Sequence, residues 1–263
     1  MILEISISNY GSVLIYISDK EFQKLIIKYL PFTSNAEVWK EEVYFQTPID
    51  EDVKGEKILK VASGDVCYWP PGKALCLFYG ITQPYSPVIR IGEIIGPYYG
   101  LRDIEDSSRL EVKKYQPPKD YEDVILLMRE HDIIAGTRTT DIESIVLNYH
   151  VRGRRIGIEV YIEEYGYHIE GDALFKYIPE PYVLNVLNKM QKSIEGYEGV
   201  RVDINEDGYV CLTSYAEDKE GLIDRIRELA LAYEAILNEL NICLLYTSPS
   251  PRDLSTSRMP SSA

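Results

Sequence analysis

Residues 64–80 read GDVCYWPPGKALCLFYG, and this stretch decides the fold of the N-terminal half of the chain. Two short apolar runs, residues 66–69 and 74–79, flank a turn sequence made of Pro70, Pro71 and Gly72. Proline fixes φ, lacks a backbone donor and favours extended geometry in the residue before it, so a strand should end at Trp69. The second run is closed by a glycine, which predicts a buried strand of a small barrel.

The sequence on either side of this stretch predicts more short strands and one helix. Residues 3–8 alternate apolar and polar side chains, and residues 13–17 follow a turn, as in a hairpin. Ser18 or Asp19 can cap a short helix that ends before Pro31. Extended segments follow at residues 37–45, 88–95 and 109–112. One helix among many short strands is typical of a closed antiparallel barrel.

These segments resemble a known family. The run YWPPGKALCLFYG resembles the signature of the small prokaryotic cyclophilin-like proteins, and the segments KVASGDVC, PVIRIGEIIG and LRDIEDSSRLEVKKY occur in the same order. The resemblance implies that residues 1–115 form an all-β cyclophilin-like barrel with one helix. It brings no agreed substrate, because the minimal family is a fold without an established activity.

The barrel should carry a ligand-binding concavity at its mouth, as small barrels commonly do. The residues that we expect to face a ligand are Trp69, Pro70, Pro71, Phe78, Tyr79 and Arg90. A protein- or peptide-binding module, or one for a small ligand, is the leading hypothesis. The alternative is a divergent peptidyl-prolyl isomerase, because the resemblance to eukaryotic-type cyclophilins implies an arginine donor beside an aromatic-lined pocket.

Arg90 is the candidate donor for that reaction, but the histidine that such enzymes also use has no counterpart here. The three histidines, His131, His150 and His168, all follow residue 115. The competing interpretation is structural: Trp69 and Phe78 belong to the core, where apolar aromatic residues usually lie, and Arg90 is a solvated strand residue.

Residues 116–121 form the expected linker, because two prolines there separate a strand pattern from a helix pattern. Residues 122–242 then predict an α+β domain with an antiparallel sheet, in the order helix, three strands, helix, hairpin, helix. The segment IEGYEGVRVDINEDGYVCLTSY and this order resemble the YbjN and type III secretion-chaperone-like group. That resemblance implies a polypeptide partner or a homodimer formed through the C-terminal domain.

Two further patterns in this half concern packing and metal binding. Apolar residues from Ile223 to Leu240 recur in steps of three and four, so the last helix should cover a sheet or a partner. Asp203, Asn205 and Asp207 match the opening of a calcium loop, but Ser214 stands where a bidentate glutamate is needed. An Asp-Gly hairpin turn explains the same letters.

Composition excludes several other classes of function. The chain has 263 residues, 45% of them hydrophobic, and a formal net charge of −14, which argues against a nucleic-acid partner. No apolar run is long enough for a membrane span, and the four scattered cysteines suit a reducing cytoplasm. Arg152, Arg154 and Arg155 should form a hairpin tip that could dock an acidic partner. We expect no cofactor and no bound metal.

The last 21 residues of the sequence, CLLYTSPSPRDLSTSRMPSSA, differ sharply in composition from the rest of the chain. The string resembles the in-frame translation of a sequencing-library adapter, so residues 243–263 are interpreted as a disordered artefact. The genuine sequence is expected to stop near Ile242.

Overall fold

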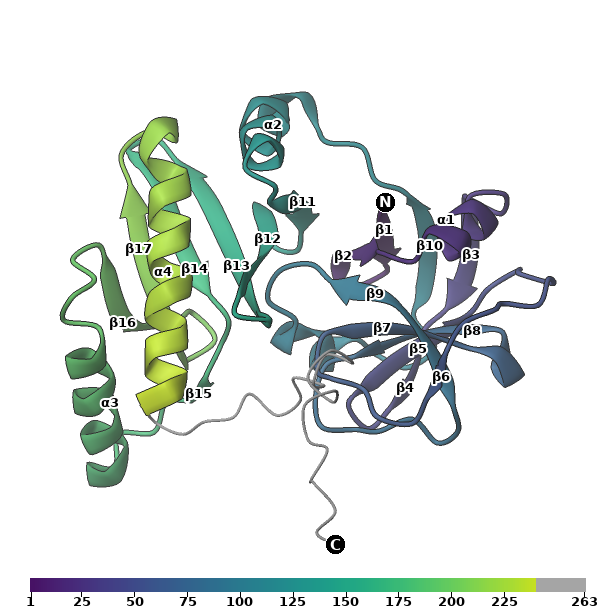
Figure 1. The fold of residues 1–263 in the computed structure, drawn as a ribbon, viewed down its shortest axis with the longest axis horizontal. Helices are drawn as coiled ribbons and strands as arrows, with labels where there is room; N and C mark the ends of the chain where they lie inside the picture. The colour runs from purple at the N-terminus through teal and green to yellow at the C-terminus, as the bar shows by residue number, and fades with distance from the viewer. Residues whose placement is uncertain (240–263) are drawn as a thin grey trace, which may run out of the picture.

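The computed structural model describes residues 1–239, and the expected adapter-derived segment lies outside the described residues. The described chain forms two sheets, each with its own helices, that pack side by side (Figure 1). The first sheet curls into a nearly closed antiparallel barrel with one α-helix, and the second is an antiparallel sheet covered by helices. The expected fold class, a barrel followed by an α+β domain, is therefore confirmed.

Among residues 1–239, the first sheet contains ten strands in the spatial order β3-β10-β1-β2-β9-β7-β8-β5-β4, with β6 paired to β9. In chain order the strands are β1 (Ile2–Ile7), β2 (Gly11–Ile17), β3 (Phe32–Asn35), β4 (Glu37–Trp39), β5 (Glu42–Gln46), β6 (Lys57–Ile58), β7 (Asp65–Trp69), β8 (Ala74–Phe78), β9 (Val88–Ile94) and β10 (Arg109–Lys114). Helix α1 (Lys20–Ile26) begins after Asp19, whose carboxylate accepts a hydrogen bond from the Phe22 backbone at 2.7 Å, as expected of a cap.

The Trp-Pro-Pro-Gly sequence forms the corner between β7 and β8, as the sequence predicts. Residues Pro70–Gly72 make a single 3₁₀ turn (η1), and the flanking strands pair so that Trp69 lies opposite Ala74. A Cβ atom on Gly72 would lie 2.3 Å from the Trp69 indole ring, so only glycine fits beneath the ring. The barrel interior is filled by buried side chains, including those of Ile5, Ile15, Phe45, Tyr68 and Leu75.

The second sheet has seven strands within the described residues, in the order β11-β12-β13-β14-β17-β15, with β16 also paired to β17. Its elements are α2 (Glu122–Glu130), β11 (Ile134–Thr139), β12 (Glu143–Val151), β13 (Arg154–Glu163), β14 (Gly166–Gly171), β15 (Phe175–Lys176), α3 (Pro181–Ser193), β16 (Val200–Ile204), β17 (Tyr209–Ala216) and α4 (Lys219–Glu239). Short 3₁₀ turns, η2 (Tyr99–Asp103) and η3 (Lys119–Tyr121), lie in the preceding connections.

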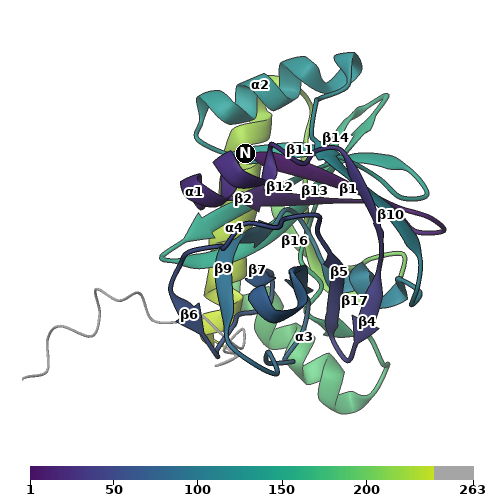
Figure 2. The same cartoon turned by 90° about the vertical axis from the view of Figure 1, so that its right-hand side faces the viewer.

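Helix α4 lies along one face of this sheet, and α3 packs beside α4 (Figures 1 and 2). The apolar stripe of α4 is buried there, with Ile226, Ala230 and Tyr233 each 0% exposed, so the stripe covers a sheet face. The expected series of three strands before α3 was wrong, because β11 and β15 add to it. The sequence of β11, IAGTRT, carries few apolar residues, and the strand packs beside β2 of the barrel.

The two sheets are joined by a buried polar and apolar contact. Asn148 of β12, 4% exposed, donates to the Ile94 carbonyl at 2.8 Å and accepts from the Gly96 backbone at 2.9 Å. A separate apolar cluster of Leu14, Ile95, Tyr115, Ile125 and Val146 spans the same joint. Because these groups are buried and paired, the joint fixes the two domains against each other.

Candidate functional site

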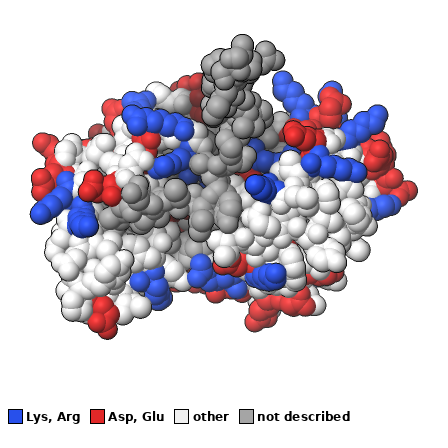
Figure 3. Space-filling model, turned by 60° about the horizontal axis from the view of Figure 1, so that its bottom comes forward, with Lys and Arg blue, Asp and Glu red and all other residues white. Residues whose placement is uncertain are grey.

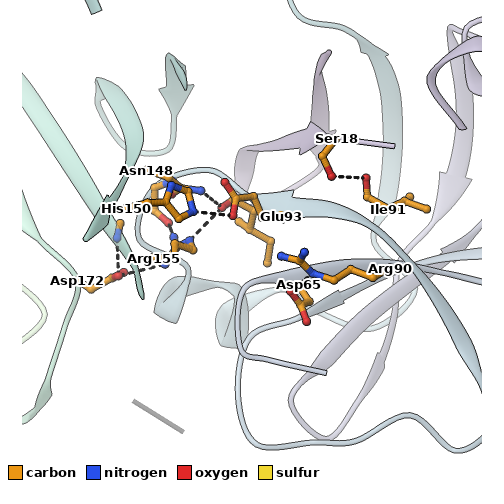
Figure 4. Close-up of polar contacts among 12 residues, drawn as sticks. Ser18, Asp65, Arg90, Ile91, Glu93, Asn148, His150, Arg155 and Asp172 are labelled. Carbon is orange, nitrogen blue, oxygen red and sulfur yellow. Dashed lines mark hydrogen bonds and ion pairs between the residues drawn. The ribbon is translucent and has the colours of Figure 1, made fainter. Parts of the chain in front are cut away.

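A cleft with a volume of about 610 Å³ lies where the barrel faces the second sheet. Its walls come from both domains (Figure 4). The acidic, basic and histidine side chains that line it are Asp65, Arg90, Glu93, His150, Arg154 and Arg155. We call this site the interdomain cleft.

Two paired barrel strands supply one wall of the cleft. Strands β7 and β9 are antiparallel, with a bulge between Val66 and Cys67, and the bulge sets Arg90 opposite Cys67 while Asp65 lies opposite Glu93. Arg90 Nε donates to Asp65 Oδ1 at 2.5 Å. The Arg90 side chain is 51% exposed and the Asp65 side chain only 7%, so the pair presents its guanidinium to the cleft.

Glu93 and His150 form a second pair, which crosses from the barrel to β12 (Figure 4). The distance between His150 Nε2 and Glu93 Oε2 is 3.2 Å. Burial by itself raises the pKa of Glu93, but hydrogen bonds from His150 and Asn148, with the charges of His150 and Arg155, outweigh burial and leave the pKa lowered. Glu93 is therefore ionised at neutral pH.

Arg155 acts as a clamp between the domains. Its guanidinium pairs with Asp172 at 3.1 Å, donates to the carbonyls of Ile94 and Gly96, and lies 4.5 Å from the centre of the Tyr98 ring. Arg155 was expected at a hairpin tip that could dock an acidic partner, but it lies within β13, its side chain is 12% exposed, and it pairs with Asp172 and barrel carbonyls instead. Arg152 and Gly153, with φ of 48° and 81°, do form the tip.

The cleft is locally cationic on an acidic protein. Arg90, Arg154 and Arg155 line it against Asp65 and Glu93, whereas the whole chain has a formal net charge of −14. On the face drawn in Figure 3, basic and acidic side chains are interspersed over the visible surface. This charge balance favours a ligand that carries an acceptor or anionic group.

The residues that the sequence proposes as ligand-facing do not form one concavity. Arg90 lines the interdomain cleft, whereas Trp69 lines a separate pocket on the barrel's outer surface. Phe78 is 0% exposed beneath that pocket, and Tyr79 faces the barrel core, where its hydroxyl donates to the Lys40 carbonyl at 2.9 Å. Pro70 and Pro71 lie in the η1 turn.

The other residues of the cleft carry no motif in the sequence. Asp65 lies opposite Glu93 because β7 pairs with β9, and His150 joins them only because β9 and β12 meet across the joint. The clustered arginines near Gly153 are a local signal in the sequence, but they do not identify a site alone.

A third cavity, of about 450 Å³, lies elsewhere along the boundary between the domains and is acidic. Glu159 of β13 and Glu170 of β14 are directly opposite each other in it. Glu159 pairs with the Arg138 guanidinium and accepts from Ser144. Burial and then the charge of Glu159 raise the pKa of Glu170 to about 7.

Comparison with known proteins identifies the first of the two domains. A family model described as Cyclophilin-like matches residues 1–113. The N-terminal part of the chain is a cyclophilin-like domain. The solution structure of the hypothetical protein AF2241 from Archaeoglobus fulgidus is similar to the cyclophilin-like domain, with 31% sequence identity and a TM-score of 0.40, over 44% of this chain and 95% of that one. The comparison with curated proteins gave no match.

In the part of the chain that the structure describes, no helix has both the length and the apolar character of a membrane span. Residues 1–239 likewise contain no cluster of three or more acidic, histidine or cysteine side chains placed to hold a metal ion.

Proposed function

We propose that the protein is a ligand-binding protein whose site is the interdomain cleft, and that its ligand is a small molecule with a carboxylate or phosphate group. The observation that carries the proposal is the hydrogen bonding and exposure of the Arg90 guanidinium. Its one hydrogen bond to another described residue uses Nε, and half of the side chain is exposed in the cleft. The guanidinium's outer nitrogens are thus free to hold two oxygens of a ligand.

The pairing of the other charges supports binding over catalysis. The Arg155 guanidinium already binds Asp172 and barrel carbonyls, so this residue stabilises the cleft and does not contact a ligand directly. The lowered pKa of Glu93 makes this carboxylate a weak base at neutral pH. A rigid cleft with fixed charges suits recognition of a ligand that is already complementary to it.

Isothermal titration calorimetry with inorganic phosphate, citrate and adenosine monophosphate tests the proposal. The wild type should bind at least one of these anions, Arg90→Gln should bind it at least tenfold more weakly, and Arg90→Lys should fall between them. Arg109→Gln is the matched control, because Arg109 is an exposed arginine on the barrel strand β10. Equal binding by wild type and Arg90→Gln, or no binding of any of the three, would overturn the proposal.

A divergent prolyl isomerase is the second candidate, with Arg90 as donor to the prolyl nitrogen. It has weaker support, because none of its expected aromatic walls, Trp69, Phe78 and Tyr79, lines the cleft. Prolyl isomerisation of a test peptide by wild type and Arg90→Ala decides this point. A wild type with no activity, or an Arg90→Ala variant as active as the wild type, would remove the candidate.

For the C-terminal domain we keep the YbjN-like assignment and a polypeptide partner or second copy as proposals. Helix α3 and the segment before it leave large apolar side chains exposed, with Ile178 54%, Tyr182 77% and Leu184 47% exposed. Such side chains are common in protein interfaces. Sedimentation velocity of the wild type and Tyr182→Ser should show a dimer that the substitution weakens. A monomer at all concentrations would exclude the second copy.

A further inference from the structure

The pocket that contains Trp69 differs in character from the interdomain cleft. It has a volume of about 330 Å³ and lies on the outer surface of the cyclophilin-like domain. Its aromatic walls are Trp39 of β4, Tyr44 of β5, Trp69 of β7 and Tyr85 of the loop before β9. Both tryptophans of the 263-residue chain therefore line this one pocket. We call it the aromatic pocket.

Two of the aromatic rings are held in place by their own contacts. Trp69 Nε1 donates to Ser86 Oγ at 2.7 Å, which fixes the indole ring. The Tyr44 ring lies at 88° to the indole, with 6.4 Å between ring centres, and its hydroxyl donates to Glu37 at 2.5 Å. The two rings thus form adjoining walls that need no rearrangement to receive a ligand.

A buried carboxyl group forms part of the same pocket. Glu42 of β5 lines the pocket and is 6% exposed. It takes part in none of the ion pairs found among residues 1–239, and its neighbour there is the Cys76 thiol. Burial raises the pKa of Glu42, because the ionised form has no ion pair to compensate for the loss of water.

The surroundings of the pocket are also negative. The pKa of Tyr44 is raised to about 12, first by its hydrogen bond to Glu37, then by burial and by the charges of Glu37, Glu42 and Asp106. The chain already places one cation on a ring of this pocket, since Lys40 Nζ lies 4.5 Å from the centre of the Trp39 ring. Aromatic faces and carboxylates attract cations through the same electrostatic field.

We propose that the aromatic pocket is a binding site for an organic cation, a methylated or quaternary ammonium group. Such a group carries its charge on an apolar surface, so it gains from aromatic faces without the oxygen ligands that a metal ion needs. Glu42 supplies the counter-charge at the pocket wall. The proposal is independent of the interdomain cleft, whose ligand has the opposite charge.

Titration with choline, monitored by tryptophan fluorescence, tests this proposal directly, because both fluorophores line the pocket. The neutral control ligand is 3,3-dimethylbutan-1-ol, which has the shape of choline without the charge. Choline should change the emission with saturation and should bind about tenfold more tightly than the neutral alcohol. Equal affinity for the two ligands would contradict the proposal. So would the absence of a saturable change in emission at choline concentrations up to about 100 mM.

Variants identify the residues that bind choline. Glu42→Gln should lower the affinity for choline at least fivefold and leave the affinity for the neutral alcohol unchanged. Trp39→Leu should lower the affinity for choline by a similar factor. This variant provides an independent test if Glu42→Gln fails to fold. Glu111→Gln, which removes an exposed carboxylate from β10, should bind choline as the wild type does. Full choline affinity in both pocket variants would overturn the assignment.

Discussion

Replacing Glu170 by glutamine should stabilise the protein at alkaline pH and change its stability much less in acid. Glu170 lies across from Glu159 in the acidic cavity between the domains, and Glu159 is held by Arg138. Burial comes first, and the charge of Glu159 second, among the causes that raise the pKa of Glu170 from 4.5 to about 7. A hydrogen bond from Asn205 opposes the increase without cancelling it.

The sign and size of the effect follow from proton linkage. The folded state holds the Glu170 proton more tightly than the unfolded state, so stability is greatest below the unfolded pKa and falls as pH rises from 4.5 to about 7. At about 1.4 kcal/mol for each pKa unit, this difference corresponds to a loss of up to about 3 kcal/mol. Glutamine stays neutral, so Glu170→Gln avoids the loss.

Urea denaturation followed by far-UV circular dichroism measures the difference at several pH values. At about pH 8 the free energy of unfolding of Glu170→Gln should exceed that of the wild type by up to about 3 kcal/mol, and the excess should shrink steadily toward about pH 4. Glu164→Gln, which removes an exposed carboxylate from the turn before β14, is the control. A difference that is constant with pH, or a variant less stable than the wild type at about pH 8, would show that Glu170 does not carry a raised pKa in the folded protein.

Two other predictions concern the joint between the domains. Asn148→Ala removes both hydrogen bonds to the segment from Ile94 to Gly96 and leaves buried backbone groups unpaired, so urea denaturation should show a loss of about 2–4 kcal/mol. Gly96→Ala adds a Cβ atom 2.5 Å from Val146 Cβ at a φ of +80°, whereas Gly153→Ala, at a φ of +81°, meets no atom within 4 Å. Gly96→Ala should therefore lower the free energy of unfolding by at least about 1 kcal/mol more than Gly153→Ala does. Equal losses of stability in the two variants would contradict the packing argument.

Local sequence signals were sufficient for much of the fold. The two prolines and Gly72 predicted the corner between β7 and β8, and Asp19 predicted the start of α1. The Asp207 and Gly208 pair predicted the turn between β16 and β17, where Gly208 has a φ of +75°. Each of these features depends on the backbone preferences of a few adjacent residues, which a sequence states directly.

The candidate site could be predicted only in part. The sequence named Arg90, which lines the cleft, but the other lining residues Glu93, His150 and Arg155 meet through the docking of two domains, which no local pattern encodes. Phe78 was grouped with Tyr79, yet consecutive residues of a strand point to opposite faces, and the structure places them in different apolar clusters. Strand periodicity alone could have separated the two residues.

We propose that the cleft between the cyclophilin-like domain and the second sheet holds an anionic ligand on Arg90. Crystals of the wild-type protein soaked with a mixture of small carboxylates and phosphates test it most directly. We predict ligand density in the cleft, with an acidic group within hydrogen-bonding distance of the Arg90 guanidinium. Density for these anions only at other surfaces, with the cleft free of them, would contradict the claim.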